Sequence, residues 1–458
     1  MGTEKTKIVS IVYFKYLGVM MILKRLYLVL TLTVLALSGL AAQEKELSLD
    51  ECIKIGLEKN TNLHSSKQKV LFAEYKLKEA NSQRLPSLKF NAGYTRLSSI
   101  DPFAITIPPN YKVSISPNIV DSYSLKLTLQ QPLFTGFRLS GNSDLSEYNY
   151  QASIQDLSKD QIELVLNIKT AYWTLFKVIK IKEAIDKNVL QIQSHIQDIQ
   201  NLFKQGMATK NDLLKVQVQL SDAQIRQMDA VNNIRMAELN LNNIIQLPLT
   251  IKPKIDQTVS KETIDIKEID YYTDAAEKTR PELKAVDLRI KAGESAITVA
   301  KSGWYPQVFL VGNYNYSNPN QRIFPQQNKF KDTWDVGVNL SWDIWNWGTA
   351  SHQTGEASAQ LEQTKDQLKS TRDLITLEVT QNYLTMLQNK DKIIAAQSSV
   401  EQAEENYRLT ADKFKEGLAL NSDLLDAETS LLQANTNYIK SIADFNISKA
   451  KLEKAIGQ

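Results

Sequence analysis

Residues that could do chemistry are few in this chain of 458 residues, and they form no catalytic pattern. The three histidines (His64, His195 and His352) and the single cysteine, Cys52, lie far apart and lack the spacing of metal ligands. The sequence has no nucleophile elbow, no phosphate-binding glycine loop and no HExxH motif. We therefore expect no enzyme activity, no cofactor and no metal site.

The polar residues that recur at a fixed spacing belong to a twelve-residue stretch that occurs twice. It reads FKQGMATKNDLL at Phe203–Leu214 and FKEGLALNSDLL at Phe414–Leu425, about 211 residues apart, with seven identical positions. In each copy a glycine, Gly206 or Gly417, interrupts a long helical pattern, and Asp-Leu-Leu restarts it, with Asp212 in the first copy. This order predicts a helix, a left-handed glycine cap, a short turn with an Asp or Asn cap, and a second helix.

Long helices lead into both stretches. No proline occurs between about Arg138 and Phe203, and a helix of that length would extend roughly 100 Å. Its apolar residues keep a four-three spacing: Ile185, Val189, Ile192, Ile196, Ile199 and Phe203. This spacing predicts coiled-coil packing, with a return helix from Asp212 to about Ile245.

Two further regions, residues 86–134 and 306–345, change to a period of two. Each follows a proline that ends a helical segment, Pro86 or Pro306. Four runs of about ten to twelve residues alternate apolar with polar side chains, long enough for tilted strands to cross a bilayer. Their tyrosines and tryptophans favour a transmembrane β-barrel with a polar interior, and a soluble sheet with one solvated face is the alternative. Four strands are too few to close a barrel, whose lower limit is about eight, so oligomerisation is predicted.

The N-terminus has the pattern of a secretory signal. Lys24 and Arg25 precede the apolar run Leu26–Leu37, and small residues follow up to Ala42. Residues 1–42 are therefore interpreted as an N-terminal extension and signal peptide, with Met1 and the Met20–Met21 pair both open as the start. The net charge of +3 gives no indication of a nucleic-acid partner.

The repeated patterns divide the mature chain into two copies of one unit. The first repeat comprises residues 43–246 and the second residues 269–458, joined by an irregular linker at 247–268. The predicted fold is mainly α with membrane β: long coiled-coil helices form an α-helical barrel, and β-hairpins contribute to a shared transmembrane β-barrel.

The repeat order and its motifs resemble the TolC-like outer-membrane efflux protein family. PLFTG at Pro132–Gly136 is similar to that family's hairpin exit, and the two tips are similar to its Y-x-x-G-x-x-x-x-x-D-x-L-x-A motif. The resemblance implies a homotrimer with twelve strands in one barrel in the outer membrane of a Gram-negative bacterium, and a tunnel through the periplasm. It further implies a passive exit duct for efflux or type I secretion. The partners would be a periplasmic adaptor protein, an inner-membrane transporter of RND, ABC or MFS type, and outer-membrane lipid.

The resemblance also assigns roles at the tips. Two inward-facing aspartates of the family, which constrict the periplasmic entrance, correspond to Asp423 and Asp426, while Gly206, Asp212 and Gly417 mark tip caps and the adaptor docking region. Phe414 and Ala419 replace the family's Tyr and Arg, so its hydrogen-bonded latch does not carry over. Lys210 or Lys215 are predicted instead to pair with the aspartates.

A periplasmic coiled-coil adaptor protein is the alternative. It would account for the helical hairpins and the heptads, but not for four alternating strands of bilayer length. The exported substrate and the type of inner-membrane pump are not encoded in any pattern of this chain.

Overall fold

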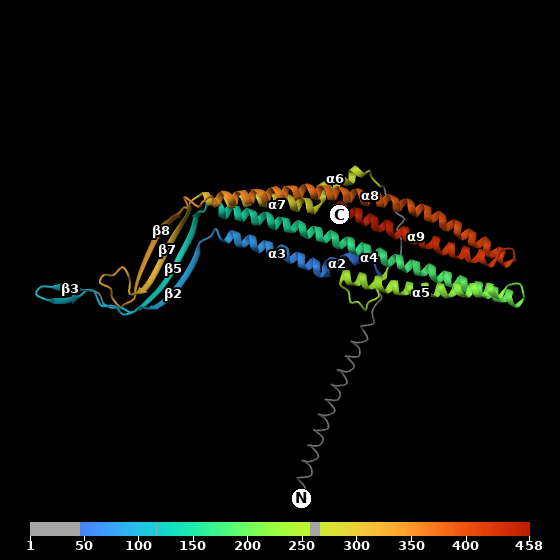
Figure 1. Ribbon diagram of the computed structural model, residues 1–458, viewed down its shortest axis with the longest axis horizontal. Coiled ribbons are helices and arrows are strands. Elements are labelled where there is room, and N and C mark those ends of the chain that lie inside the picture. The colour runs from blue at the N-terminus through green and yellow to red at the C-terminus, as the bar shows by residue number, and fades with distance from the viewer. Residues whose placement is uncertain (1–45, 116, 257–265) are drawn as a thin grey trace, which may run out of the picture. The chain divides into compact units, whose positions relative to one another are not determined.

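The computed structural model describes residues 46–115, 117–256 and 266–458 (Figure 1). The predicted signal peptide and residues 257–265 of the predicted linker lie outside these ranges. The described residues fall into two compact units, one of residues 46–55 and 174–256, the other of residues 56–173 and 266–458.

Each repeat opens with a short and a longer helix. The first has α2 (Leu49–Lys59, 11 residues) and α3 (Thr61–Ser82, 22 residues), and the second has α6 (Ile269–Thr279, 11 residues) and α7 (Pro281–Lys301, 21 residues). The helical segment that was predicted to end before Pro86 is therefore divided into two helices. Asn60 divides it because its Oδ1 accepts a hydrogen bond from the Leu63 N–H at 3.0 Å and so begins a new helix. A 3₁₀ turn, η1 (Ser302–Trp304), follows α7.

Both predicted hairpins join into one antiparallel sheet of four strands. The strands are β2 (Ser87–Arg96), β5 (Asp121–Phe134), β7 (Gln307–Asn318) and β8 (Lys331–Ser341), in the order β2-β5-β7-β8. The pairing of β5 with β7 joins the two repeats, with Leu127 opposite Tyr314.

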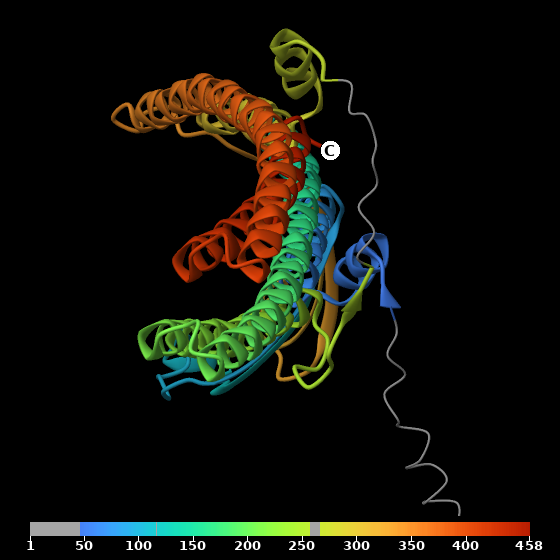
Figure 2. The ribbon, with the colours of Figure 1, turned by 90° about the vertical axis from the view of Figure 1, so that its right-hand side faces the viewer.

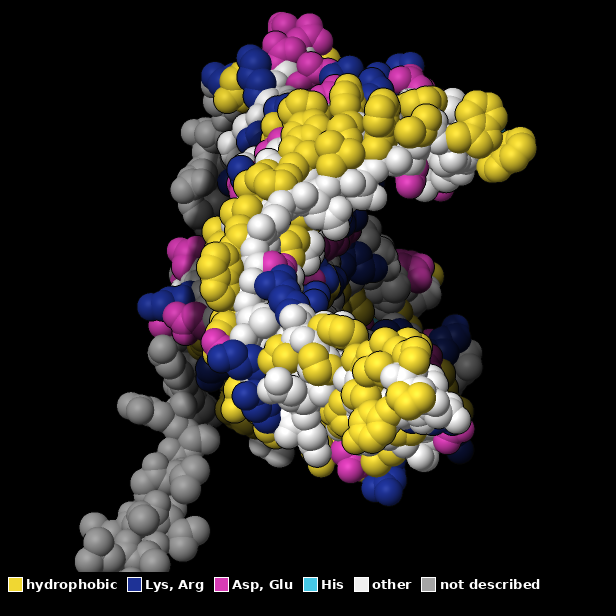
Figure 3. Space-filling model, turned by 90° about the vertical axis from the view of Figure 1, so that its left-hand side faces the viewer, with side chains coloured by type: hydrophobic (Ala, Val, Ile, Leu, Met, Phe, Trp, Pro, Cys, Tyr) yellow, Lys and Arg dark blue, Asp and Glu magenta, His cyan; other side chains and the backbone are white. Residues whose placement is uncertain are grey.

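One face of this sheet is apolar across all four strands. The register places the following residues on it: Leu88, Phe90 and Tyr94 of β2, Leu125, Leu127 and Leu129 of β5, Leu310 and Tyr314 of β7, and Trp334, Val336, Val338 and Leu340 of β8. All of them are exposed in the single chain. Figure 3, which views the molecule from the strand end of Figure 1, shows hydrophobic side chains gathered over these strands. So large an exposed apolar surface marks a membrane or subunit contact.

The loop between β2 and β5 contains structure that the sequence reading missed. β3 (Ala104–Ile107) and β4 (Tyr111–Ser114) pair as a separate antiparallel hairpin. Each strand has only four residues, so the alternation is too short to be distinguished from a loop rich in Pro and Asn.

The long helices have nearly equal lengths in the two repeats. α4 (Arg138–Lys204) and α8 (Thr349–Lys415) have 67 residues each, and their return helices α5 (Lys210–Ile245) and α9 (Asn421–Ala455) have 36 and 35. Figures 1 and 2 show α8 and α9 side by side as an antiparallel pair. These lengths confirm the two-repeat, mainly helical fold.

Four of the six predicted seam residues of α4 are buried, while Ile196 is half-buried and Phe203, next to the tip, is exposed. Ile185, Val189, Ile192 and Ile199 are each at most 8% exposed, and His195 is also buried there as a packing residue. On α5 the buried positions Val216, Ala223, Ala230 and Ala237 recur at intervals of seven, as a heptad requires.

Two very short strands, β1 (Glu46–Leu47) and β6 (Lys254–Ile255), pair in parallel, so part of the linker forms β-structure. Within the described ranges no helix is both long enough and apolar enough to cross a membrane.

Candidate functional site: the helical tips and the polar face of the sheet

The first tip, in the smaller unit, is closed by hydrogen bonds at both helix ends. Gly206 has φ +76°, and the Met207 N–H donates to the Leu202 carbonyl at 2.9 Å, which is the pattern of a Schellman cap. At the start of α5, Thr209 Oγ1 accepts from the Asp212 N–H (3.1 Å), and Asp212 Oδ2 accepts from the Thr209 N–H (3.1 Å). These two bonds form a capping box.

The second tip repeats the glycine cap but has only half of the capping box. Gly417 has φ +75°, and the Leu418 N–H donates to the Lys413 carbonyl at 2.8 Å. Asp423 Oδ2 accepts from the Leu420 N–H at 3.2 Å, while Leu420 has no side-chain oxygen to return the bond.

Asp212 and Asp423 therefore cap their helices from the third helical position. The N-cap residues are Thr209 and Leu420 rather than an Asp or Asn, which corrects the sequence-based assignment of the turn. The error arose because Leu is a poor N-cap and gives no local signal at that place.

The remaining predicted tip residues are exposed. Asp426, one turn beyond the cap, lies on the surface of α9, as does Asp423 at its start. Lys210 and Lys215 are exposed on α5. These lysines belong to the smaller unit and the aspartates to the larger one, so their pairing stays a prediction.

The two tip glycines also lie in open space. A Cβ placed on Gly206 or Gly417 would meet no atom within 4 Å, so their positive φ, and not crowding within the chain, disfavours larger residues there. Phe414, which stands where the family has Tyr, is 5% exposed, so its ring is used in packing.

The second group of candidate residues is on the polar face of the sheet. Thr128 Oγ1 donates to Asn313 Oδ1 at 2.9 Å, and Asn313 Nδ2 donates to Asp335 Oδ1 at 2.7 Å, which links β5, β7 and β8. No local pattern singled out Asn313, because its two partners come from other strands. Lys89 and Lys126 are on the same face, so it has charges of both signs.

Among the described residues, no group of three or more His, Cys, Asp or Glu side chains is placed to hold a metal ion. The candidate residues are charged and polar side chains at the tips of helical hairpins and on one face of a sheet whose other face is apolar. A sheet with one exposed apolar face and one polar face is typical of a protein associated with a membrane.

The chain belongs to the outer membrane efflux protein family, whose model matches residues 53–245 and 273–458. This result confirms the predicted family, the predicted function as an outer-membrane channel and the location in the outer membrane of a Gram-negative bacterium. Members of the family are channels and not enzymes.

Individual relatives cover most of the chain at low identity. It is 21% identical to the toxin and drug export protein A of Aggregatibacter actinomycetemcomitans over 414 residues, covering 87% of this chain and 85% of the relative. It is 21% identical to the outer membrane protein TolC of Escherichia coli over 456 residues, covering 92% and 85%. The fold is similar to that of the outer membrane protein VceC from Vibrio cholerae, with a TM-score of 0.74, 16% identity, and coverage of 89% and 96%. These findings support the channel and not the adaptor alternative.

Proposed function

We propose that the chain is the passive exit duct of a tripartite efflux or type I secretion system, and that it works as a homotrimer. The observation that carries the proposal is the four-stranded sheet. Its apolar face is exposed, and among the described residues each outer strand, β2 and β8, has one edge without a partner strand. Unpaired edges and exposed apolar surface are both unfavourable. Three copies joined β8 to β2 would close twelve strands into one barrel, with the apolar face toward lipid and the Thr128–Asn313–Asp335 face toward water.

The partners follow from what the barrel does not supply. A passive duct needs energy from a partner, and an inner-membrane transporter of RND, ABC or MFS type would supply it. A periplasmic adaptor would dock at the helical tips. The open space above Gly206 and Gly417 supports this docking, because a partner helix can approach a backbone that has no side chain in the way.

The proposed entrance constriction is formed by Asp423 and Asp426. Asp423 has a structural role as a helix cap, and this role does not require that it face the tunnel. Asp426 has no such role, and the equivalent residue of the first tip is Lys215, so a cap shared by the two repeats does not account for it. In a trimer these residues would bring six carboxylates together, a ring that repels anions and attracts cations.

The experiment is single-channel conductance in a planar bilayer with Asp423→Asn/Asp426→Asn. Asparagine keeps an oxygen that can accept the Leu420 N–H bond, so the charge is removed while the cap is retained. We expect a low, cation-selective conductance in the wild type, and a higher, less selective one in the variant. Lys215→Ala is expected to raise conductance as well, if a lysine–aspartate pair helps to hold the entrance closed.

The matched control is Asp373→Asn, which removes an exposed carboxylate from the middle of α8 and should leave conductance unchanged. An open channel that is insensitive to the aspartate changes would place the gate elsewhere. A folded oligomer that forms no channel would reject the duct itself.

A further inference from the structure

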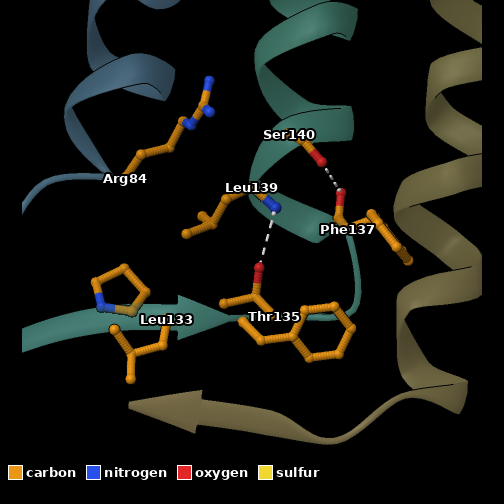
Figure 4. A pocket seen from close by; sticks show the side chains of 8 residues that line it. Arg84, Leu133, Thr135, Phe137, Leu139 and Ser140 are labelled. Carbon is orange, nitrogen blue, oxygen red and sulfur yellow. Dashed lines mark hydrogen bonds between the residues drawn. The ribbon is translucent and has the colours of Figure 1, made fainter. Parts of the chain in front are cut away.

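A pocket of about 270 Å³ lies where the sheet changes into the long helix of the first repeat (Figure 4). It is lined by Arg84, which follows α3, and by Pro132, Leu133, Phe134, Thr135, Phe137, Leu139 and Ser140, which connect β5 to α4. Arg84 is the only charged residue of this lining, so the pocket combines one cation with an apolar wall.

Hydrogen bonds hold the walls of the pocket in place. Thr135 Oγ1 accepts from the Leu139 N–H at 3.3 Å, and Ser140 Oγ donates to the Phe137 carbonyl at 3.0 Å (Figure 4). Gln131 Nε2 donates to the Arg84 carbonyl at 3.0 Å and so fixes the backbone from which the arginine extends. The guanidinium of Arg84 itself makes no hydrogen bond or ion pair with any described residue, which leaves its donors available.

The pocket is at the same end of the sheet as a group of exposed aromatic residues. Ser87 of β2 lies opposite Gln130, and Gln307 of β7 lies opposite Ser341, so the chain on both sides of the two hairpins meets at this end. The exposed aromatic side chains there are Phe137, Trp304, Tyr305, Trp342, Trp345 and Trp347. Aromatic girdles of this kind mark the boundary between the hydrocarbon and the headgroups of a membrane.

The depth of the pocket rests on the proposed function, that is, on insertion of the sheet in the outer membrane. The long helices begin at this end of the sheet, so the boundary is the one that faces the periplasm. At that level the ligands available to a cation beside an apolar wall are the headgroups of the inner leaflet.

The two repeats differ at this place. Arg84-Leu85-Pro86 of the first repeat corresponds to Trp304-Tyr305-Pro306 of the second. Arginine and tryptophan are both suited to a membrane interface, but only the guanidinium binds a phosphate through two parallel hydrogen bonds. The cationic pocket therefore belongs to the first repeat alone.

We propose that this pocket binds the phosphate of an anionic glycerophospholipid of the inner leaflet. Arg84 binds the phosphate, while Leu133 and Phe137, both exposed, contact the first methylenes of an acyl chain. An anionic lipid is favoured over a zwitterionic one because the lining has no carboxylate to pair with an ammonium group. A trimer has three such sites.

The test is native mass spectrometry of the delipidated trimer titrated with phosphatidylglycerol or with phosphatidylethanolamine. We expect the wild type to retain up to three molecules of phosphatidylglycerol and to prefer it over phosphatidylethanolamine. Arg84→Gln should weaken phosphatidylglycerol binding at least tenfold, since it removes the charge and the paired donors. Arg84→Lys should keep part of the affinity. Lys67→Gln, which removes an exposed cation from α3, is the matched control and should bind as the wild type does.

Four results would overturn the lipid site. One is equal phosphatidylglycerol binding by the wild type and Arg84→Gln, and another is equal affinity for the two lipids. The third is loss of the trimer in Arg84→Gln without any lipid preference in the wild type, which would identify the pocket as a subunit contact. Displacement of phosphatidylglycerol by millimolar inorganic phosphate, which has no acyl chain, would likewise show an anion site and not a lipid site.

Conductance of the same variants separates this proposal from the function on which it rests. A wild type that forms channels, with Arg84→Gln unchanged in lipid binding, rejects only the lipid site. A wild type that forms no channel rejects the duct, whatever its lipid binding.

Discussion

A single thiol reports on the packing of the smaller unit. Cys52, the only cysteine of the chain, is 0% exposed on α2. Burial, with a smaller contribution from the charge of Glu51, raises the pKa of the Cys52 thiol to about 11. Because the thiolate is the reactive form, Cys52 should be inert in the folded protein.

We predict that a maleimide reagent at pH 8 modifies Cys52 only after denaturation. Since the folded pKa lies above the ordinary value of 9.0, the folded state holds this proton more tightly, so its contribution to stability is lost as the pH rises from about 9 toward 11. Cys52→Ser/Ser65→Cys, which moves the thiol to an exposed position of α3, should label at once and is the control. Rapid labelling of the native wild type would show that α2 opens readily.

At the scale of the helix, the two tips differ by one side-chain oxygen. α5 begins with a complete capping box and α9 with half of one, because Leu420 replaces the Thr209 of the first tip. We expect Thr209→Ala to destabilise the start of α5 by about 1 kcal/mol, the usual loss when an N-cap oxygen is removed.

Hydrogen exchange of the first-turn amides measures this effect. The Asp212 amide should exchange roughly fivefold faster in Thr209→Ala, whereas Thr209→Ser, which keeps the hydroxyl, should resemble the wild type. Leu420→Thr should slow the Asp423 amide by supplying the missing half of the box. If neither tip responds, the helix starts are held by packing and not by their caps.

At the scale of the molecule, the end of the second repeat is tied to three other helices by charges. Arg280, 4% exposed between α6 and α7, donates from Nη1 to the Lys454 carbonyl (2.9 Å) and from Nη2 to Glu378 Oε2 of α8 (2.8 Å). Lys454 Nζ lies 2.7 Å from Glu378 Oε1 and 3.8 Å from Glu163 Oε2 of α4. The network thus joins α4, α8, α9 and the α6–α7 junction within the larger unit.

We predict that Arg280→Ala lowers the free energy of unfolding by about 3 kcal/mol or more and so lowers the melting temperature strongly. The reason is that Glu378 loses one partner in a largely buried network. Arg280→Lys keeps the charge but loses the paired hydrogen bonds, so its melting temperature should lie between those of the wild type and Arg280→Ala. Arg408→Ala breaks an exposed ion pair with Glu405 and should leave the melting temperature unchanged. Circular dichroism during heating measures all three, and equal effects of Arg280→Ala and Arg408→Ala would reject the role of the network.

Much of this architecture is determined by the sequence alone, because the signals are local. The heptads of α4, the glycine caps at Gly206 and Gly417 and the alternation in the strands each depend on residues a few positions apart. The repeat then confirms each signal by presenting it twice. The break at Asn60 and the β3–β4 hairpin were not predicted. One cap residue, or two strands of four residues each, form a pattern too short to be recognised.

Only the tertiary structure decided which distant residues meet. The hydrogen bond from Thr128 to Asn313 joins residues 185 positions apart, and that of Arg280 to the Lys454 carbonyl joins residues 174 apart. The pocket of Arg84 likewise required the end of α3 to meet the β5–α4 turn. Periodicity shows which face of a strand or helix is apolar, but the partner of that face depends on packing energies summed over the whole chain, and no local pattern records them.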